Sequence, residues 1–382
     1  MSYDQFIAAK LGVIASAGID APLRDYDLFP HQSDLTRWAL RRGKAAIFAD
    51  TGLGKMRMAI AWADTVFQHT CHPVMILCPL AVAQQFVAEG LLMGIEVTHC
   101  REQQDVRQGI NITNYDRMHK FDMSQFSGVA LDESSIIKSH ASKTLALLMD
   151  AFRTTPYKLC CTATPSPNDW TELGTHAEFL GVRSRSEMLA EFFVHDGGDT
   201  SVWRLKGHAR AVFWRWVASW GAMIRSPADL GYDASAYALP PLHIHQHTVE
   251  IEHNPMHGLF AQEAQTLTER RQSRRDSMAA RVQACADLVN AHSDEPWIVW
   301  CDLNDEGDML ERAIDGCVQV AGADDNDTKE RRMVGFSTGQ HRVLISKQKI
   351  CGWGMNWQHC SNQAFVGVND SYEGFYQAVR RS

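Results

Sequence analysis

The sequence of 382 residues lacks several features that mark particular classes of protein. It has no run of 18 or more apolar residues, which argues against a membrane-spanning helix. Its first residues, MSYDQFIAAKLG, contain no basic stretch followed by an apolar one, so they do not resemble a secretory signal peptide. Internal repeats and low-complexity segments are also lacking. We therefore expect a globular protein of the cytoplasm.

The ten cysteines include no Cys-x-x-Cys pair, the spacing typical of zinc sites and redox motifs. Several lie inside apolar runs, such as Cys78 in VMILCP and Cys160 in KLCCTAT. This placement favours buried free thiols in a reducing compartment. A zinc site at Cys71 with His72, or at His359 with Cys360, is disfavoured because adjacent residues rarely converge on one ion.

An excess of positive charge is lacking too, because the formal net charge is −8. The chain is therefore no general polycation, and any contact with nucleic acid must use local basic patches. The length exceeds what one hydrophobic core usually supports, so two domains of ordinary size are expected.

Short apolar runs alternate with helical stretches, a pattern typical of parallel strands joined by crossover helices. We expect strands at 45–49, 74–78, 128–132 and 158–164, and a second set at 297–301, 317–322, 342–346 and 364–368. Between the two sets, 181–240 is helical and tryptophan-rich, and 256–292 predicts one long polar helix. The predicted layout is an α/β domain at 1–180, a helical Trp- and Arg-rich insertion at 181–255 and a second α/β domain at 256–382.

The first strand leads into a glycine turn, Ala49-Asp50-Thr51-Gly52-Leu53-Gly54-Lys55-Met56, and then into a helix that reaches about Phe67. This geometry directs backbone N–H groups and a helix N-terminus at phosphates, and Lys55 would reach the β- and γ-phosphates. We therefore expect residues 51–56 to bind a nucleotide. Met56 departs from the pattern, because a thioether cannot replace the hydroxyl that meets Mg²⁺. The alternative is an ordinary strand, turn and helix with a surface lysine.

An acidic pair, Asp132-Glu133, follows the strand at 128–132, at the edge where α/β sheets bind ligands. Asp132 would hold Mg²⁺ through water, and Glu133 would orient and deprotonate the attacking water. The next strand ends in Thr162-Ala163-Thr164-Pro165, whose hydroxyl groups can bond the acidic pair and pass on the state of the nucleotide. Solvated loop carboxylates are the alternative, and the position after a buried strand disfavours it.

The ordered set of motifs resembles helicase superfamily 2, and within it the Snf2-like branch, with phage- and prophage-encoded DEAD/DEAH-like members as the closest likeness. The motifs are Phe29-Pro30-His31-Gln32, Thr51-Gly52-Leu53-Gly54-Lys55, Cys78-Pro79-Leu80, Thr113-Asn114-Tyr115, Asp132-Glu133-Ser134-Ser135 and Thr162-Ala163-Thr164-Pro165. The resemblance implies two RecA-like P-loop domains that use ATP and Mg²⁺, in a bacterial cell or a phage-infected host. It also implies that Gln32 reads the adenine edge and that Thr113 and Asn114 face the nucleic-acid backbone.

The second half carries later motifs of the same family. Gly352-Trp353-Gly354-Met355-Asn356 resembles the glycine-rich motif that touches nucleotide and nucleic acid, and Tyr376-Gln377-Ala378-Val379-Arg380-Arg381 resembles the arginine-finger motif. By this resemblance Gly352, Gly354, Asn356 and Gln377 take part in coupling, and Arg381 is the first arginine finger. The second finger would fall beyond Ser382, so we expect a second domain that is incomplete at its C-terminal end.

Two basic stretches are candidates for contact with nucleic acid. Residues 201–225 carry five basic and no acidic residues, among them Arg204, Lys206 and Arg210. The tryptophans among them can stack on bases, but Trp216 and Trp220 are spaced as a buried helix stripe, which is the favoured interpretation. The helix predicted at 256–292 has like charges at 270/274 and 271/275, so Arg274 and Arg275 would gain from an anionic partner. A solvated helix face is the alternative.

The leading hypothesis is an ATP-dependent motor that translocates on double-stranded DNA and acts as a monomer, which is what the resemblance to its superfamily implies. One alternative is an RNA-directed member of superfamily 2, because no residue here distinguishes a 2′-hydroxyl. Another is a non-hydrolysing relative that binds nucleotide and DNA, which Met56 and the missing second finger favour.

Overall fold

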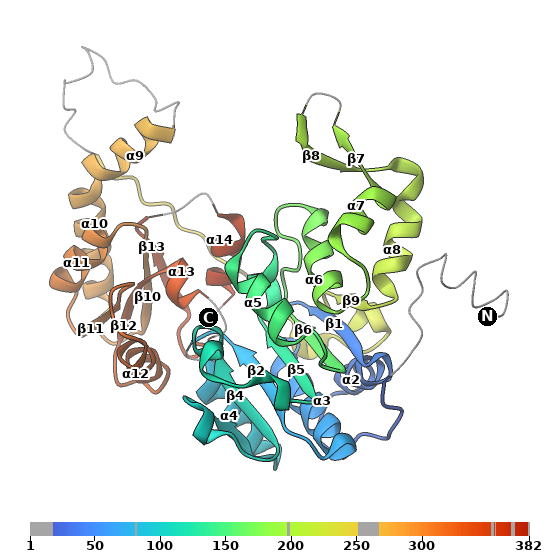
Figure 1. Cartoon of the computed structure of the whole chain (residues 1–382). Coiled ribbons are helices and arrows are strands. Elements are labelled where there is room, and N and C mark those ends of the chain that lie inside the picture. The colour runs from blue at the N-terminus through green and yellow to red at the C-terminus, as the bar shows by residue number, and fades with distance from the viewer. Residues whose placement is uncertain are drawn as a thin grey trace, which may run out of the picture. The chain divides into compact units, whose positions relative to one another are not determined.

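The computed structural model describes residues 18–80, 82–196, 199–250, 267–352, 355, 357–367 and 371–380. The chain divides into two compact units, Met1–Leu239 and Pro240–Ser382 (Figure 1). Each unit has its own parallel sheet and its own hydrophobic core, which confirms the predicted α/β class. Among the described helices, none has the length and apolar character needed to cross a bilayer.

The sheet of the first unit contains seven described strands, and every neighbouring pair is parallel. In spatial order they are β3 (Val97–His99), β4 (Ile110–Asn114), β2 (Val74–Cys78), β5 (Gly128–Asp132), β6 (Tyr157–Cys161), β1 (Lys44–Ala49) and β9 (Gly221–Ile224). The strands β2, β4 and β5 are buried along their whole length, as expected for a parallel sheet covered on both faces. The predicted strands β1, β2, β5 and β6 are confirmed, whereas β3, β4 and β9 were not expected.

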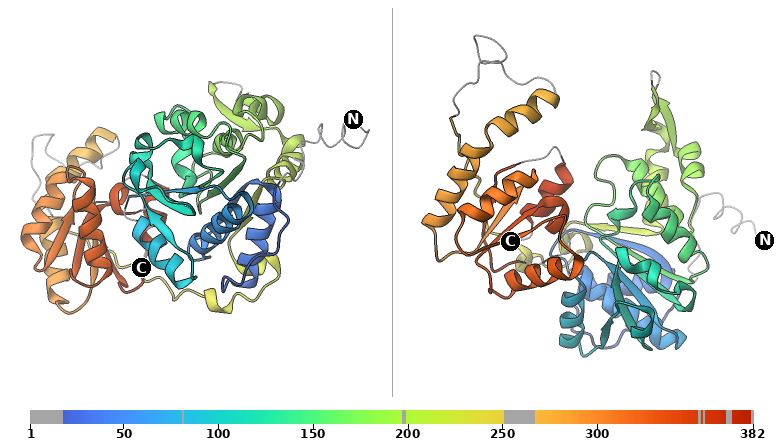
Figure 2. Two further views of the ribbon diagram at one scale, coloured as in Figure 1. Left: turned by 60° about the horizontal axis from the view of Figure 1, so that its bottom comes forward. Right: turned by 60° about the vertical axis from the view of Figure 1, so that its left-hand side comes forward.

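Helices cover both faces of this sheet (Figure 2). One face carries α2 (Pro30–Arg42), α3 (Lys55–Thr70) and α4 (Val82–Leu92). The other carries α5 (Lys143–Ala151), α6 (Leu173–Phe179), α7 (Arg185–Phe192) and α8 (Arg210–Ala218). Alternate residues of each strand face opposite sides, so one strand contributes to two separate layers of packing.

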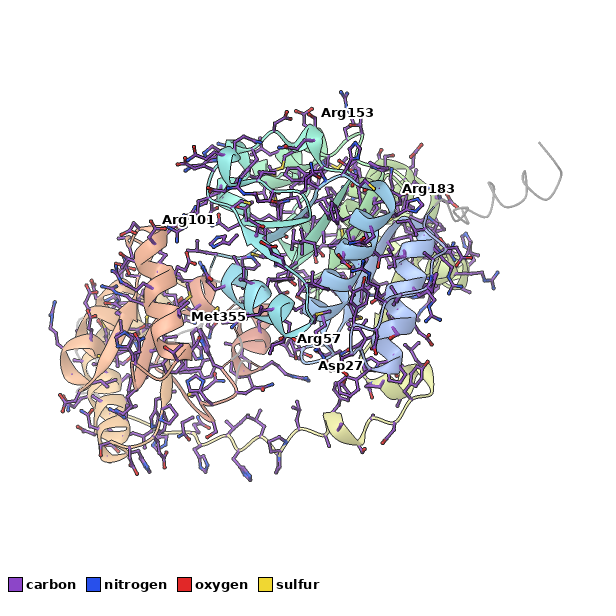
Figure 3. All side chains as sticks on the ribbon, turned by 90° about the horizontal axis from the view of Figure 1, so that it is seen from below. Asp27, Arg57, Arg101, Arg153, Arg183 and Met355 are labelled. Carbon is purple, nitrogen blue, oxygen red and sulfur yellow. The ribbon has the colours of Figure 1, made fainter. Side chains whose placement is uncertain are left out.

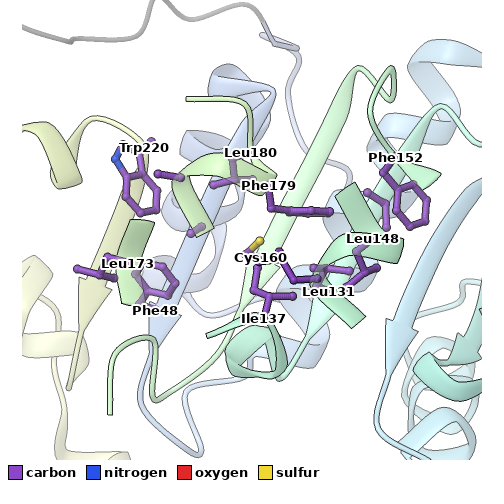
Figure 4. Close-up of a cluster of buried hydrophobic side chains, with 14 of the residues drawn as sticks. Phe48, Leu131, Ile137, Leu148, Phe152, Cys160, Leu173, Phe179, Leu180 and Trp220 are labelled. Atoms are coloured by element: carbon purple, nitrogen blue, oxygen red, sulfur yellow. The ribbon is translucent and has the colours of Figure 1, made fainter. Parts of the chain in front are cut away.

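A hydrophobic core lies between the sheet and α5 to α8 (Figure 4). Phe48 of β1 and Leu131 of β5 pack there with Leu148 of α5 and Phe179 of α6. Trp216 of α8 and Trp220, which follows α8, complete the same core and are fully buried, as their spacing predicted. Truncating a core aromatic of this kind costs about 3–5 kcal/mol. The α7–α8 region is therefore part of the first domain's core.

The expected helical insertion at 181–255 is wrong in two respects. The segment contains an antiparallel hairpin, β7 (Phe193–Asp196) with β8 (Asp199–Leu205), and it contributes β9 to the main sheet. β9 forms because its backbone pairs with β1, and Asp50 N donates to Ile224 O at 3.0 Å. Tertiary pairing of this kind overrides the weak strand signal of the short segment GAMI.

The second unit has a four-stranded parallel sheet among its described residues, in the order β11 (Cys317–Val320), β12 (Val343–Lys347), β10 (Trp297–Cys301) and β13 (Asn362–Phe365). The helices are α9 (Leu267–Asp276), α10 (Met278–Ala291), α11 (Asn304–Ala313), α12 (Asn326–Ser337), α13 (Gln348–Cys351) and α14 (Tyr372–Val379). The second predicted set of strands is thereby confirmed, with shifted ends. The core packs Val289 and Leu310 against Val299 and Ile345.

The long helix expected at 256–292 is instead two helices. Residues 256–266 lie outside the described part, and α9 and α10 are separated at Ser277. The Ser277 hydroxyl donates to Ser273 O at 2.7 Å, a bond back to the preceding turn that bends helices.

Candidate functional site

The candidate site lies at the carboxyl ends of three neighbouring strands, β5, β6 and β1. Because these strands are parallel, the segments that follow them emerge at the same edge of the sheet. The glycine loop follows β1, the acidic pair ends β5, and Thr162 follows β6. The topology thus brings together three motifs that span residues 51–162 of the chain.

The glycine loop adopts a conformation that only glycine allows at two positions. Gly52 has φ +81° and Gly54 has φ +80°, both in the left-handed region that side chains disfavour. A Cβ on Gly54 would lie 2.1 Å from Gln32 Nε2, so a side chain at this position would displace the Gln32 amide. No side chain caps α3, which begins at Lys55. Its first N–H groups therefore suit an anion.

The ammonium group of Lys55 lies within the same loop. Its Nζ donates to Ala49 O at 2.9 Å and to Asp50 O at 3.0 Å. Thr51 N donates to Asp50 Oδ1 at 2.7 Å, which fixes the start of the turn. The lysine is thereby held beside the N–H groups that open α3, the position that a phosphate-binding loop needs.

Gln32 and His31 of α2 hold the loop from the other side. Gln32 is only 2% exposed, and its Nε2 donates to Leu53 O at 3.2 Å while its Oε1 accepts from Phe29 N at 3.1 Å. Burial lowers the pKa of His31, and a hydrogen bond with the backbone of Leu53 opposes that shift. Both side chains therefore support the loop. Reading of an adenine edge by Gln32 stays a prediction.

The acidic pair is buried and strained. Asp132 is 7% exposed and Glu133 is 6% exposed, and Glu133 has φ +50°, an uncommon conformation for a residue with a side chain. Thr162 Oγ1 donates to Glu133 Oε2 at 3.4 Å, and Thr164 N donates to Thr162 Oγ1 at 3.2 Å. The two threonines expected to act in coupling are therefore linked to Glu133.

Opposite charges meet around the end of β6. Burial raises the pKa of the Cys161 thiol well above its usual value, the charge of Asp132 raises it further, and the charge of Lys55 opposes the shift. One buried thiol thus lies within the field of both the lysine and the carboxylates. Tyr115 closes the other side, where its hydroxyl donates to Asp132 O at 2.7 Å. Burial, followed by the charge of Asp132, raises the pKa of Tyr115 well above its usual value.

Met56 occupies the first turn of α3, where a hydroxyl was expected, and it is half-buried. The neighbouring Arg57 is held by Glu89 of α4 at 2.8 Å and by Asp27 at 3.8 Å (Figure 3). These contacts fix the start of α3 without supplying an oxygen ligand. The hard oxygen donors suited to Mg²⁺ are the carboxylates of Asp132 and Glu133.

Thr113 and Asn114 end β4 and are 0% and 4% exposed. Asn114 Oδ1 accepts from Arg117 N at 3.1 Å and so caps the 3₁₀ helix Tyr115–Lys120. Both side chains are therefore buried, where they support the local fold. Contact with a nucleic-acid backbone, which the resemblance implies for them, stays a prediction and would require them to become exposed.

The basic residues of the first unit have different surroundings. Lys206 Nζ donates to Ala190 O at 2.9 Å and Glu191 O at 2.8 Å, so it caps the C-terminus of α7. Arg204 is exposed on β8. Arg210 is exposed at the start of α8, with its guanidinium 5.7 Å from the ring centre of Trp170. Arg210 is therefore the clearer surface candidate, and Lys206 serves the local fold.

Part of the second-unit prediction lies outside the described residues, namely Gly354, Asn356 and Arg381. Gly352 ends α13, and a Cβ there would lie 2.3 Å from Gln348 O, so glycine is required. Gln377 is fully buried in α14. Arg274 pairs with Asp302 at 3.5 Å, and Arg275 is exposed.

One buried hydrogen bond to the segment that follows the acidic pair could not be predicted from sequence patterns. Ser134 Oγ and His176 Nε2 are hydrogen-bonded at 3.1 Å, although they lie 42 residues apart. His176 belongs to α6 and no motif contains it. The helix has the sequence LGTHAEF, in which Thr175 and Glu178 are also polar, so its sequence does not single out His176.

Comparison with known proteins gave one family match and several similar solved structures. Residues 31–217 match the model of the SNF2-related domain family, and no curated protein matches the chain. Two of the matching solved structures are of the Sulfolobus solfataricus SWI2/SNF2 ATPase core. The core in complex with double-stranded DNA is 14% identical, with 93% of this chain and 84% of that chain covered and a TM-score of 0.45. The core domain alone is also 14% identical, with 95% of this chain and 85% of that chain covered and a TM-score of 0.45.

The matched segment includes the glycine loop, the acidic pair and Thr162, which are the three motifs gathered at the edge of the first sheet. Its match and the ordered motifs agree on one family. Residues 31–217 thus match the SNF2-related domain, in keeping with the predicted resemblance to the Snf2-like branch of helicase superfamily 2.

Proposed function

We propose that this protein is an ATP-hydrolysing motor that moves on double-stranded DNA. The observation that carries the proposal is the meeting of Lys55, the Asp132–Glu133 pair and Thr162 at the carboxyl edge of three adjacent strands. A phosphate-binding loop alone would suit many proteins. A buried acidic pair beside that loop, in a SNF2-related domain, supports ATP hydrolysis in particular.

Each residue has a chemical task in this proposal. The N–H groups at the start of α3 and Lys55 bind the phosphates and stabilise the charge that develops on them. Glu133 accepts a proton from the attacking water, and Thr162 holds one of its carboxylate oxygens in place. Gln32 and Gly54 keep the loop in its shape by close packing.

The residues present fit Mg²⁺ with one exception. Asp132 offers a buried carboxylate and would hold the ion through water, whereas Met56 offers none of the oxygen that Mg²⁺ prefers. Bound Mg²⁺ would supply positive charge to the phosphates. Water in the place of the missing hydroxyl ligand is compatible with the half-buried surroundings of Met56.

Double-stranded DNA is the proposed partner because the Snf2-like branch is the one the motifs match. Arg204 and Arg210, both exposed, supply local positive charge on a chain of net charge −8. Arg274 and Arg275 of α9 are further candidates. We expect the phosphate contacts to make binding weaker as salt rises. Monomeric action belongs to the same proposal.

The motor step would be a closure of two RecA-like domains on one ATP. In the proposal Arg381 reaches the γ-phosphate from the second domain, and Gly352, Gly354, Asn356 and Gln377 take part in coupling. An arginine finger stabilises charge only in the closed state, which links hydrolysis to movement.

The first prediction tests hydrolysis and the DNA partner together. ATP turnover of the wild type should rise with double-stranded DNA and less with single-stranded RNA. Glu133→Gln should lower kcat by at least about a hundredfold, the lower range for loss of general-base catalysis, while ATP binding stays measurable. A coupled phosphate-release assay and nucleotide titration measure the two properties. Stronger stimulation by RNA would favour an RNA-directed motor, and full turnover by Glu133→Gln would reject the assignment of the base.

A second candidate function, a nucleotide and DNA binder without turnover, is favoured by Met56. If the thioether limits metal binding, Met56→Thr should raise kcat or lower the Mg²⁺ concentration for half-maximal turnover by about threefold to tenfold, the range of roughly 1 kcal/mol in binding. Magnesium titrations of both proteins, with Met58→Leu as a buried control on the same helix, measure the effect. Unchanged magnesium dependence would mean that the hydroxyl is dispensable here.

A further inference from the structure

His176 occupies an unusual place behind the acidic pair. It lies in α6, has no exposed surface, and is hydrogen-bonded through Nε2 to Ser134 Oγ at 3.1 Å. The ring of Phe48 in β1 meets the imidazole edge to face at 5.3 Å. A polar ring so enclosed by packing has one fixed position, and the hydroxyl that it bonds is fixed with it.

Ser134 is the residue that follows Glu133 and opens the 3₁₀ helix Ser134–Ile137. Glu133 itself has φ +50°, a conformation that persists only when its surroundings enforce it. Tyr115 holds the carbonyl of Asp132 on the preceding side at 2.7 Å, and His176 holds Ser134 on the following side. The strained residue is therefore clamped from both neighbours along the chain.

The opposite end of the same helical segment reaches the surface. The 3₁₀ helix Trp170–Glu172 runs directly into α6, and Asp169 caps it by accepting from Thr171 N at 2.6 Å. Trp170 is 38% exposed, and its ring meets that of Trp214 at 5.3 Å while the Arg210 guanidinium lies 5.7 Å from it. We name Trp170, Arg210 and Trp214 the aromatic–arginine surface.

We propose that His176 is a positioning residue, which holds Glu133 through Ser134 and connects that carboxylate to the aromatic–arginine surface through 170–179. The inference rests on the proposed ATP hydrolysis and DNA binding. A cation beside an exposed indole suits a DNA phosphate and sugar edge. A ligand that shifts Trp170 moves a short, capped helical segment, and the buried imidazole transmits that shift to the serine hydroxyl.

Burial is consistent with a neutral imidazole in this role. It disfavours the charged ring and lowers the pKa of His176 to about 4. At neutral pH the ring is therefore one donor and one acceptor, which allows a hydroxyl partner without burying a charge.

The test compares kcat and KM for ATP, with and without saturating double-stranded DNA, in the wild type and a set of variants. His176→Phe keeps an aromatic ring and removes the hydrogen bond, and Ser134→Ala removes it from the other side. We expect each to lower DNA-stimulated kcat by about tenfold, a modest part of what misplacement of a catalytic group can cost, with KM within about twofold. Their combination should be no worse than either alone.

His176→Gln supplies a side-chain amide that can still bond Ser134, so it should retain at least about a third of wild-type kcat by keeping that bond. Thr175→Val is the matched control, because Thr175 is equally buried in α6 but donates to Glu172 O. It should leave kcat unchanged. Melting temperatures of all variants separate lost positioning from lost folding. Equal kcat in the Phe, Gln and wild-type proteins would overturn the role of His176.

A separate experiment tests the connection between His176 and the aromatic–arginine surface. Trp170→Ala should reduce the stimulation of turnover by DNA, and adding His176→Phe should bring no multiplicative further loss. Independent, multiplicative effects would reject the connection and leave only the local clamp. Absence of turnover in the wild type, with or without DNA, would instead overturn the proposed function and a role for His176 in hydrolysis along with it.

Discussion

Buried polar residues around the acidic pair make its chemistry depend on single side chains. His176 and Tyr115 each hold one neighbour of Glu133, and Thr162 holds its carboxylate. Loss of one partner leaves the other buried and unpaired, which costs more than the bond itself was worth. Substitutions here should therefore have effects on stability as well as on turnover, and pH is a way to separate them.

The prediction at the residue scale concerns the stability of the fold in acid. The pKa of His176 falls from its usual 6.5 to about 4 on folding, so between these values the unfolded chain binds a proton that the folded chain does not. Stability therefore falls as pH falls through this window. From pH 7.5 to pH 5 the wild type should lose about 2 kcal/mol more than His176→Gln.

Urea unfolding of both proteins at the two pH values measures the difference. Other titrating groups act equally on wild type and variant, so the subtraction isolates His176. An equal loss in both proteins would show that the imidazole is accessible to protons in the folded state.

Among the elements of the second unit, α10 and α11 are joined by a nearly buried ion pair. Arg281 Nη2 lies 2.7 Å from Glu306 Oε1, and the Glu306 side chain is 1% exposed. Glu306 also accepts from Asp302 N at 2.9 Å and Leu303 N at 3.1 Å, which starts α11. Arg281 therefore serves the packing of two helices.

Removal of one partner should be costly. Arg281→Met is expected to destabilise the protein by about 3–5 kcal/mol, because it leaves a buried carboxylate without its cation. Arg312→Met, an exposed position on α11, is the control and should change stability by less than about 0.5 kcal/mol. Denaturant unfolding measures both. A loss of similar, small size in the two variants would mean that the pair contributes nothing in solution.

The elements that could be predicted from sequence are those with a strong local signal. VMILC and WIVWC are continuous apolar runs, and both form strands at the expected residues. β4 was missed as a strand because INITN carries two asparagines, which disfavour strands, and pairing with β2 and β3 overrides that preference. β9 was missed for the same reason, since its partner β1 lies far away in the chain, whereas the two strands of the hairpin pair with each other.

In the candidate site, too, residues in local motifs could be predicted and contacts between distant residues could not. Gly52, Lys55, Asp132 and Glu133 stand in short motifs whose spacing reflects local geometry, so they could be found without a structure. The bond between Ser134 and His176 crosses 42 residues and depends on how α6 packs on the sheet. Lys206 shows the converse, because its charge suggested a partner outside the chain and its ammonium group caps α7.

At the scale of the whole molecule, the boundary of the first unit decides what can fold alone. The core that holds Phe48 and Leu131 also contains Phe213, Trp216 and Trp220, and β9 covers the edge of β1. A fragment of residues 1–239 should unfold cooperatively on heating. A fragment of residues 1–180, the boundary suggested by sequence patterns, should not, because losing three large core aromatics removes about 3–5 kcal/mol each.

Circular dichroism during heating and limited proteolysis of the two fragments provide the measurement. The longer fragment serves as the positive control for expression and handling. A sharp transition in the shorter fragment would show that α7, α8 and β9 are an appendage to a core that is complete without them.

The tryptophans differ in solvent exposure, so intrinsic fluorescence can report on one part of the surface. Trp62, Trp216 and Trp220 are enclosed, so dissolved quenchers such as iodide reach them poorly, whereas Trp170 stands open to solvent. The red edge of the intrinsic emission should therefore come disproportionately from open indoles such as Trp170. A ligand that binds over that indole changes its fluorescence intensity. Binding to this part of the surface can therefore be followed in real time without attaching a dye.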